Sequence, residues 1–67
     1  MAVAKVTEII SSSNRSFEDA VVKGIERAEK TLANVHGAWI AEQKVVVEKG
    51  KITEYRVTMR VTFVLKD

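Results

Sequence analysis

The sequence contains no cysteine and no proline, and glycine occurs only three times in 67 residues. Without cysteine, the chain can form neither a disulfide bond nor a thiolate zinc site. No apolar run approaches the roughly 18 residues of a membrane span, and residues 1–13 carry acid and hydroxyl side chains where a signal peptide would be apolar. From these missing signals we expect a cytoplasmic protein with no membrane partner.

Neither sign of charge predominates, because the net charge of +2 arises from 11 basic and 9 acidic residues spread along the chain. Nucleic-acid-binding proteins usually collect their basic residues on one surface, so we expect no nucleic-acid partner. The length allows a single domain, residues 1–67. A domain this short hides only about 60% of the surface that its unfolded chain exposes, and it commonly relies on neighbouring subunits for stability.

The longest regular pattern is residues 52–65, in which apolar and polar side chains alternate. This period of two is typical of a half-buried strand. At about 3.3 Å per residue, the strand would run for about 45 Å. The sequence therefore predicts a long strand in the middle of a sheet, with these apolar positions on its buried face: Tyr55, Val57, Met59, Val61, Phe63 and Leu65.

A helix is predicted to open at Ser16, whose hydroxyl can accept a hydrogen bond from a backbone amide of the first turn, with Asp19 three residues later. We expect it to end near residues 34–36, with Gly37 in the left-handed conformation that often follows a last turn. Its apolar side chains recur every three or four residues and trace one stripe: Phe17, Val21, Ile25, Ala28, Leu32 and Val35.

Two shorter strands complete the chain. Residues 3–10 are rich in β-branched side chains and predict a first strand, followed by a polar loop over residues 11–15. Residues 38–47 predict a second strand. Residues 48–51 then form the turn into the third strand, with Gly50 supplying a positive φ.

The predicted fold class is α+β: a βαββ unit with a three-stranded antiparallel sheet, the third strand central, and one helix packed on one face. One helix can cover only one face of such a sheet. The uncovered face is too polar for a core, so we expect other subunits to pack against it in a closed symmetric assembly. Its predicted members are Arg56, Thr58, Arg60 and Thr62, with Trp39, Ala41 and Gln43 as neighbours.

Three segments taken together resemble the dodecin family: residues 13–17, residues 25–32 and residues 55–65. Dodecins are small βαββ proteins that assemble as hollow dodecamers, and the best-known branch binds flavins. The resemblance extends from Val6 to Leu65. It implies a homo-oligomer, a dodecamer, that binds or stores a small ligand.

The resemblance also implies candidate ligand-binding residues. Flavin-binding dodecins carry a tryptophan at the start of the second strand, which stacks on the isoalloxazine ring, and a glutamine on the third strand. These positions fall on Gly37 and Arg56 here, while Trp39 lies two residues on and on the same face. We therefore expect a flavin of the FMN or riboflavin type, or another flat anionic ligand, at Trp39, Arg56, Gln43 and Gly37.

Residues 40–43 and 50–53 instead resemble a second branch, the calcium-binding dodecins. Calcium takes six to eight oxygen ligands, and no loop of this chain carries acids at such a spacing. The metal ligands are therefore unknown, and a calcium site would have to be assembled between chains. The alternative to a flavin-binding protein is thus an assembly of the same kind that binds calcium or is purely structural.

Each candidate side chain also has a structural interpretation. Trp39 either stacks on a ligand or fills a subunit interface, where large aromatic side chains are enriched. Arg56 either clamps a phosphate or carboxylate or forms an ion pair with a neighbouring strand. No nucleophile, base and orienting group occur together, so we expect a binding protein and no enzyme.

Overall fold

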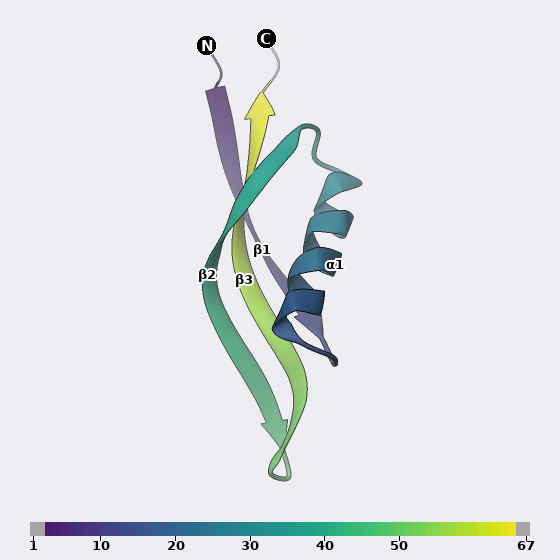
Figure 1. Ribbon diagram of the computed structural model, residues 1–67. Coiled ribbons are helices and arrows are strands. Elements are labelled where there is room, and N and C mark those ends of the chain that lie inside the picture. The colour runs from purple at the N-terminus through teal and green to yellow at the C-terminus, as the bar shows by residue number, and fades with distance from the viewer. Residues whose placement is uncertain (1–2, 66–67) are drawn as a thin grey trace.

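The computed structural model describes residues 3–65, and its four elements follow the predicted order (Figure 1). They are β1 (Val3–Ser13), α1 (Phe17–Glu29), β2 (Val35–Glu48) and β3 (Lys51–Leu65). The sheet order is β1-β3-β2, and β3 pairs antiparallel with both neighbours. This confirms the predicted βαββ fold with the long third strand in the centre.

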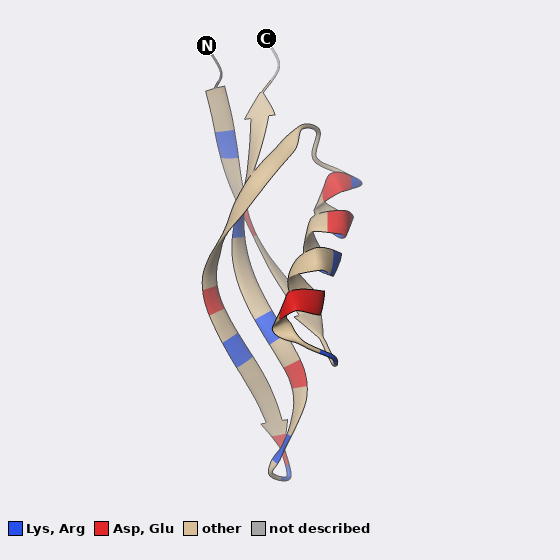
Figure 2. Cartoon of the chain, in the orientation of Figure 1, with Lys and Arg blue, Asp and Glu red and all other residues tan. Residues whose placement is uncertain are grey.

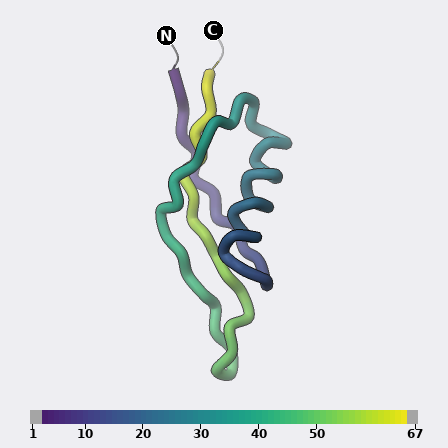
Figure 3. Tube along the Cα trace, viewed as in Figure 1, coloured from purple at the N-terminus to yellow at the C-terminus, as the bar shows by residue number. Residues whose placement is uncertain are grey.

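The two ends of the described chain lie at the same end of the sheet (Figure 3), because Val3 pairs with Leu65. At the opposite end, the β2–β3 hairpin extends beyond α1. Its turn residues Lys49 and Gly50 have φ angles of 53° and 76°. Two successive positive φ values match the twist of the flanking strands, so the prediction for Gly50 is confirmed.

Helix α1 begins as predicted and is anchored to the end of β1. Ser16 is the N-cap, and its hydroxyl accepts a hydrogen bond of 3.0 Å from the Asp19 amide. The Asp19 carboxylate accepts a second bond of 2.6 Å from the hydroxyl of Ser13 and lies 3.4 Å from the Lys23 ammonium. Acidic side chains in this first turn also suit the positive end of the helix dipole (Figure 2).

The predicted end of the helix is wrong. Helix α1 ends at Glu29 with Lys30 as its C-cap, and Asn34, not Gly37, takes a positive φ of 59°. The Asn34 carbonyl accepts a hydrogen bond from the Val64 amide, which holds the connection against β3. Leu32 and Val35 still pack on the core from outside the helix, and so the apolar stripe continued past the helix end.

The predicted loop over residues 11–15 is wrong in its first half. Residues 11–13 belong to β1, where they pair with residues 55–57 of β3. Backbone pairing with the central strand outweighs the turn preference of the serine side chains. Strand β2 is likewise longer than the predicted residues 38–47.

The core lies between α1 and β3. Val57, Met59 and Val61 of β3 are fully buried together with Ala20 of α1, which confirms the centre of the predicted buried face of β3. Leu65, at the end of the strand, was predicted on this face but is 44% exposed. The buried helix positions are all small: Ala20, Gly24 and Ala28. They let α1 approach the sheet closely, while the larger residues of the predicted stripe flank this contact and are only partly buried.

Candidate functional site

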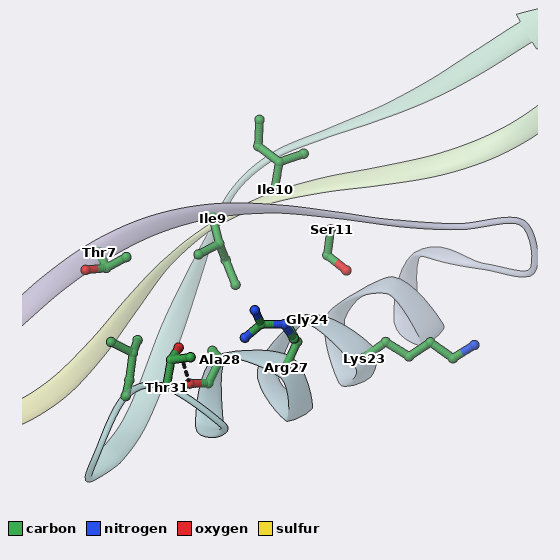
Figure 4. A pocket seen from close by; sticks show the side chains of 10 residues that line it. Thr7, Ile9, Ile10, Ser11, Lys23, Gly24, Arg27, Ala28 and Thr31 are labelled. Atoms are coloured by element: carbon green, nitrogen blue, oxygen red, sulfur yellow. Dashed lines mark hydrogen bonds between the residues drawn. The ribbon is translucent and has the colours of Figure 1, made fainter.

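The face of the sheet opposite α1, here called the helix-free face, is the main exposed surface of the sheet. Figure 4 shows that Ile9 and Ser11 point from β1 toward the helix, whereas Ile10 points away from it. The register places six cross-strand rows on the helix-free face: Ala4–Val64, Val6–Thr62–Gly37, Glu8–Arg60–Trp39, Ile10–Thr58–Glu42, Ser12–Arg56–Lys44 and Glu54–Val46. Arginine, acid and aromatic side chains thus meet on one surface.

A β-bulge in β2 changes which side chains share this face. Trp39 lies opposite Arg60, but the register shifts between Ile40 and Glu42. An extra residue in one strand reverses the alternation of the residues that follow it. Gln43 consequently lies opposite Val57, on the side of α1, and the prediction that Gln43 shares a face with Trp39 is wrong.

Trp39 and Gly37 are brought together at a hollow in the helix-free face. The Trp39 side chain is 57% exposed, and beside it lies a cavity of about 340 Å³ lined by His36, Gly37, Ala38, Trp39 and Thr62. A Cβ atom built on Gly37 would meet nothing within 4 Å. There is therefore open space over Gly37, with an indole ring beside it that offers a flat apolar surface.

Arg56 lies elsewhere on the helix-free face. Its side chain forms an ion pair of 3.1 Å with Glu54, and its cross-strand neighbours are Ser12 and Lys44. Four residues of strand, or about 13 Å, separate it from the position opposite Trp39. Within one chain, the structure does not bring Arg56 and Trp39 together.

The residue that lies opposite Trp39 is Arg60, which the sequence analysis placed on this face but did not select as a site residue. The position of the hairpin turn in the sequence was enough to predict this pairing. Counting outward from the turn at residues 49 and 50 pairs Trp39 with Arg60, because the shift at Ile40/Glu42 reverses the earlier shift at Val46/Val47. The turn chemistry alone therefore predicts this neighbour.

A second hollow of about 390 Å³ lies between α1 and β1 (Figure 4). Its walls include two basic side chains, Lys23 and Arg27, and the hydroxyls of Thr7, Ser11 and Thr31. Lys23 is already paired with Asp19. None of the predicted site residues lines this hollow.

Residues 3–65 contain no group of three or more His, Cys, Asp or Glu side chains arranged to hold a metal ion. Nor does the described part of the chain contain a helix with the length and apolar character needed to traverse a bilayer.

A βαββ unit with one face of its sheet left open, and a hollow beside an exposed indole on that face, defines a class of small ligand-binding domains. A sequence model of the family described as Dodecin matches residues 3–66. The chain belongs to the dodecin family.

Individual relatives agree with this assignment. The chain is 36% identical over 67 residues to calcium dodecin of Mycobacterium tuberculosis, covering 98% of this chain and 93% of that protein. The dodecin from Streptomyces davaonensis superposes with a TM-score of 0.94 at 32% identity, covering 98% of this chain and 97% of that one. The crystal structure of M. tuberculosis calcium dodecin, described as having a novel calcium-binding site, gives a TM-score of 0.83 at 34% identity, covering 96% and 91% of the two chains.

Proposed function

We propose that this protein is a ligand-binding and storage subunit of a hollow homo-oligomer, a dodecamer, that holds a flat ligand of the flavin type at the junctions between copies. It acts as a binding protein and not as an enzyme. The observation that carries the proposal is the hollow beside Trp39, because it lies on the face of the sheet that α1 leaves uncovered.

The hollow suits a flat ring. The indole of Trp39 is more than half exposed, and stacking of two aromatic systems contributes about 0.5–1.5 kcal/mol beyond the burial of area. Gly37 leaves the adjacent space open, so a ring can lie flat against the backbone there. The hydroxyl of Thr62 at the wall of the hollow provides a hydrogen-bonding group for the ring edge.

Assembly follows from the same face. Three large apolar side chains on it are exposed, Val6 by 45%, Ile10 by 71% and Trp39 by 57%. Exposed apolar surface of this kind marks a contact site. A second copy packed on this face would cover these side chains and enclose a ligand that lies on Trp39.

Fluorescence titration of the purified protein with riboflavin and FMN tests the proposal. We expect quenching of flavin fluorescence at micromolar protein. Trp39→Ala should abolish the quenching and leave the particle size by light scattering unchanged, whereas Ile52→Ala, an exposed apolar position near the hairpin turn, is the matched control and should retain binding. If Trp39→Ala instead changes particle size, Trp39 is an interface residue and the ligand site lies elsewhere.

Calcium is the second candidate ligand, because a relative 36% identical to this chain is named calcium dodecin. The helix-free face carries three carboxylates, Glu8, Glu42 and Glu54, each in a different row. Six to eight oxygen ligands are needed, so one chain does not fit the ion and copies would have to share it. Calorimetric titration with CaCl₂ should then show heat that Glu42→Gln removes, and Glu26→Gln on the exposed face of α1 is the control.

A further inference from the structure

We propose that Arg60 determines the class of ligand held at Trp39, by selecting flat aromatic molecules that carry a negative charge over neutral molecules of the same shape. This inference rests on the proposed function and concerns the surface beside Trp39, next to the hollow lined by His36, Gly37, Ala38, Trp39 and Thr62. It names a residue and a charge preference that the resemblance to other dodecins does not supply.

The register places Arg60 beside the indole. Arg60 on β3 is the direct cross-strand neighbour of Trp39 on β2, and both side chains are exposed on the helix-free face. Directly opposed residues of an antiparallel pair have Cβ atoms about 4.5–5.5 Å apart. A ring stacked on Trp39 therefore lies within the reach of the Arg60 side chain, which extends outward from the same surface.

A ligand can pair with the guanidinium of Arg60 more readily than with that of Arg56. Glu54 is bound to Arg56 at 3.1 Å, whereas the structure records no ion pair for Arg60 within residues 3–65. Glu8 is the other cross-strand neighbour of Arg60, but it lies on β1, on the side away from Trp39. In the cross-strand row Glu8–Arg60–Trp39, Arg60 therefore lies between Glu8 and the indole of Trp39.

The chemistry of the guanidinium defines the ligand class. Its planar fork donates two parallel hydrogen bonds to a carboxylate or phosphate, and such charge-assisted bonds are about twice as strong as neutral ones. A hydroxyl or amide in the same place forms a single weaker bond. The hollow also contains His36, whose ring nitrogens can hydrogen-bond to a ligand. The expected ligand is an aromatic ring system with a carboxylate or phosphate group.

Riboflavin and FMN form a matched pair of probes, because they share one ring system and differ by a phosphate. We expect FMN to bind the wild-type oligomer about 10-fold more tightly than riboflavin in low salt, which corresponds to about 1.4 kcal/mol. Arg60→Gln should remove this preference while the riboflavin affinity stays within about two-fold. Arg60→Lys should keep part of the preference because it keeps the charge.

The control is Arg56→Gln, which removes an arginine from the same face and strand and should leave the preference unchanged. Light scattering confirms that each variant keeps the wild-type particle size. Equal binding of FMN and riboflavin to the wild type, or a preference that survives Arg60→Gln, overturns the role of Arg60 and leaves the proposed function intact. Failure of both flavins to bind the wild type overturns the flavin-type ligand itself, and the role of Arg60 with it.

Discussion

At the scale of single residues, Gly24 is the position where the packing of α1 depends most on the absence of a side chain. A Cβ atom there would lie 2.5 Å from Met59 Cε and 2.9 Å from Ser11 Cβ. The end of Met59 can rotate, but Ser11 Cβ is attached directly to the β1 backbone. The glycine therefore serves close approach of helix and sheet, and its φ angle is an ordinary helical one.

Replacing Gly24 with alanine should lower the stability of the protein. The helix gains about 1 kcal/mol from alanine, but overpacking of a tight contact costs about 1–3 kcal/mol. We expect a net loss of about 1 kcal/mol in urea denaturation at fixed protein concentration. Glu26→Ala, on the exposed side of the same helix, is the control and should change stability little. If Gly24→Ala is more stable than the wild type, β1 can shift at Ser11 to make room for the added methyl group at little cost.

The link between Ser13 and Asp19 makes a prediction about pH. The hydrogen bond from the Ser13 hydroxyl lowers the pKa of Asp19 below its usual 3.8, the charge of Lys23 acts in the same direction, and partial burial opposes both. A lowered pKa in the folded state means that the carboxylate stabilises the fold above about pH 3.8 and that this contribution is lost as the pH falls through the folded-state pKa.

Titration of the Asp19 carboxyl carbon by NMR measures this effect. We expect its pKa to lie below 3.8 in the wild type and to move upward in Ser13→Ala, because the principal donor is gone. Asp19→Asn should flatten the acid limb of the stability curve. A Ser13→Ala variant with an unchanged Asp19 pKa would mean that Lys23 and Arg15, and not Ser13, lower the value.

At the scale of elements, two of the three register shifts in the β2–β3 pairing, at Ile40/Glu42 and Val46/Val47, decide which side chains of β2 face the ligand. Between them, residues of β2 pair one position further along than a regular hairpin would allow, so that Lys44 and not Gln43 lies opposite Arg56. Over residues 37–40 of β2, beyond the shift at Ile40/Glu42, the regular register applies again and Trp39 lies opposite Arg60. The shifts thus turn Gln43 toward α1 without moving Trp39.

Engineered disulfides test this register, and the absence of native cysteine makes the result easy to interpret. The double variant Lys44→Cys with Arg56→Cys places the two Cα atoms directly opposite each other, within the 4.4–6.8 Å that a disulfide bridges. We expect it to form an intramolecular bond on mild oxidation, seen by mass spectrometry. Gln43→Cys with Arg56→Cys should stay reduced, and preferential oxidation of that pair would contradict the bulged register.

The order of the elements could be predicted from the sequence because each has a strong local signal. Alternation in β3 identified the core residues Val57, Met59 and Val61, and the hydroxyl of Ser16 identified the helix start. The helix end was missed because Leu32 and Val35 serve the same core after the chain has left the helix. A periodic pattern reports which side chains are buried, and not which backbone conformation buries them.

The candidate site was only partly predictable, for a related reason. Trp39 and Gly37 were placed on the correct face of the sheet because they precede the bulge at Ile40/Glu42, and a bulge leaves no clear trace in this sequence. Gln43 follows the bulge, so the assumed alternation put it on the wrong face. Arg60 was missed as a site residue because the family resemblance directed attention to Arg56, whereas the pairing of strands decides which arginine accompanies Trp39.

At the scale of the whole molecule, residues 3–65 bury little apolar surface. Only five hydrophobic residues of the described range are buried, and two of these are alanine: Ala20, Ala28, Val57, Met59 and Val61. Nine large hydrophobic side chains are exposed over the same range. Small domains with such a core rely on disulfides, metals or oligomerisation, and a chain without cysteine cannot use the first of these.

Charge placed on the helix-free face should therefore weaken the assembly. Ile10 is the most exposed of the large apolar side chains there, at 71%, and Ile10→Lys would bury a charge in any interface between copies, which costs several kcal/mol unless the charge is paired. We expect light scattering to report a multiple of 7.5 kDa for the wild type and a smaller particle for Ile10→Lys.

The same charge on the helix provides the control. Val22 is 50% exposed on α1, and lysine is a good helix former, so Val22→Lys should keep the wild-type size. If Val22→Lys dissociates the particle and Ile10→Lys does not, copies meet through their helices, and the hollow beside Trp39 opens to solvent. A wild-type particle of 7.5 kDa would mean that the exposed apolar side chains need no cover, and a ligand on Trp39 would then be bound by one chain alone.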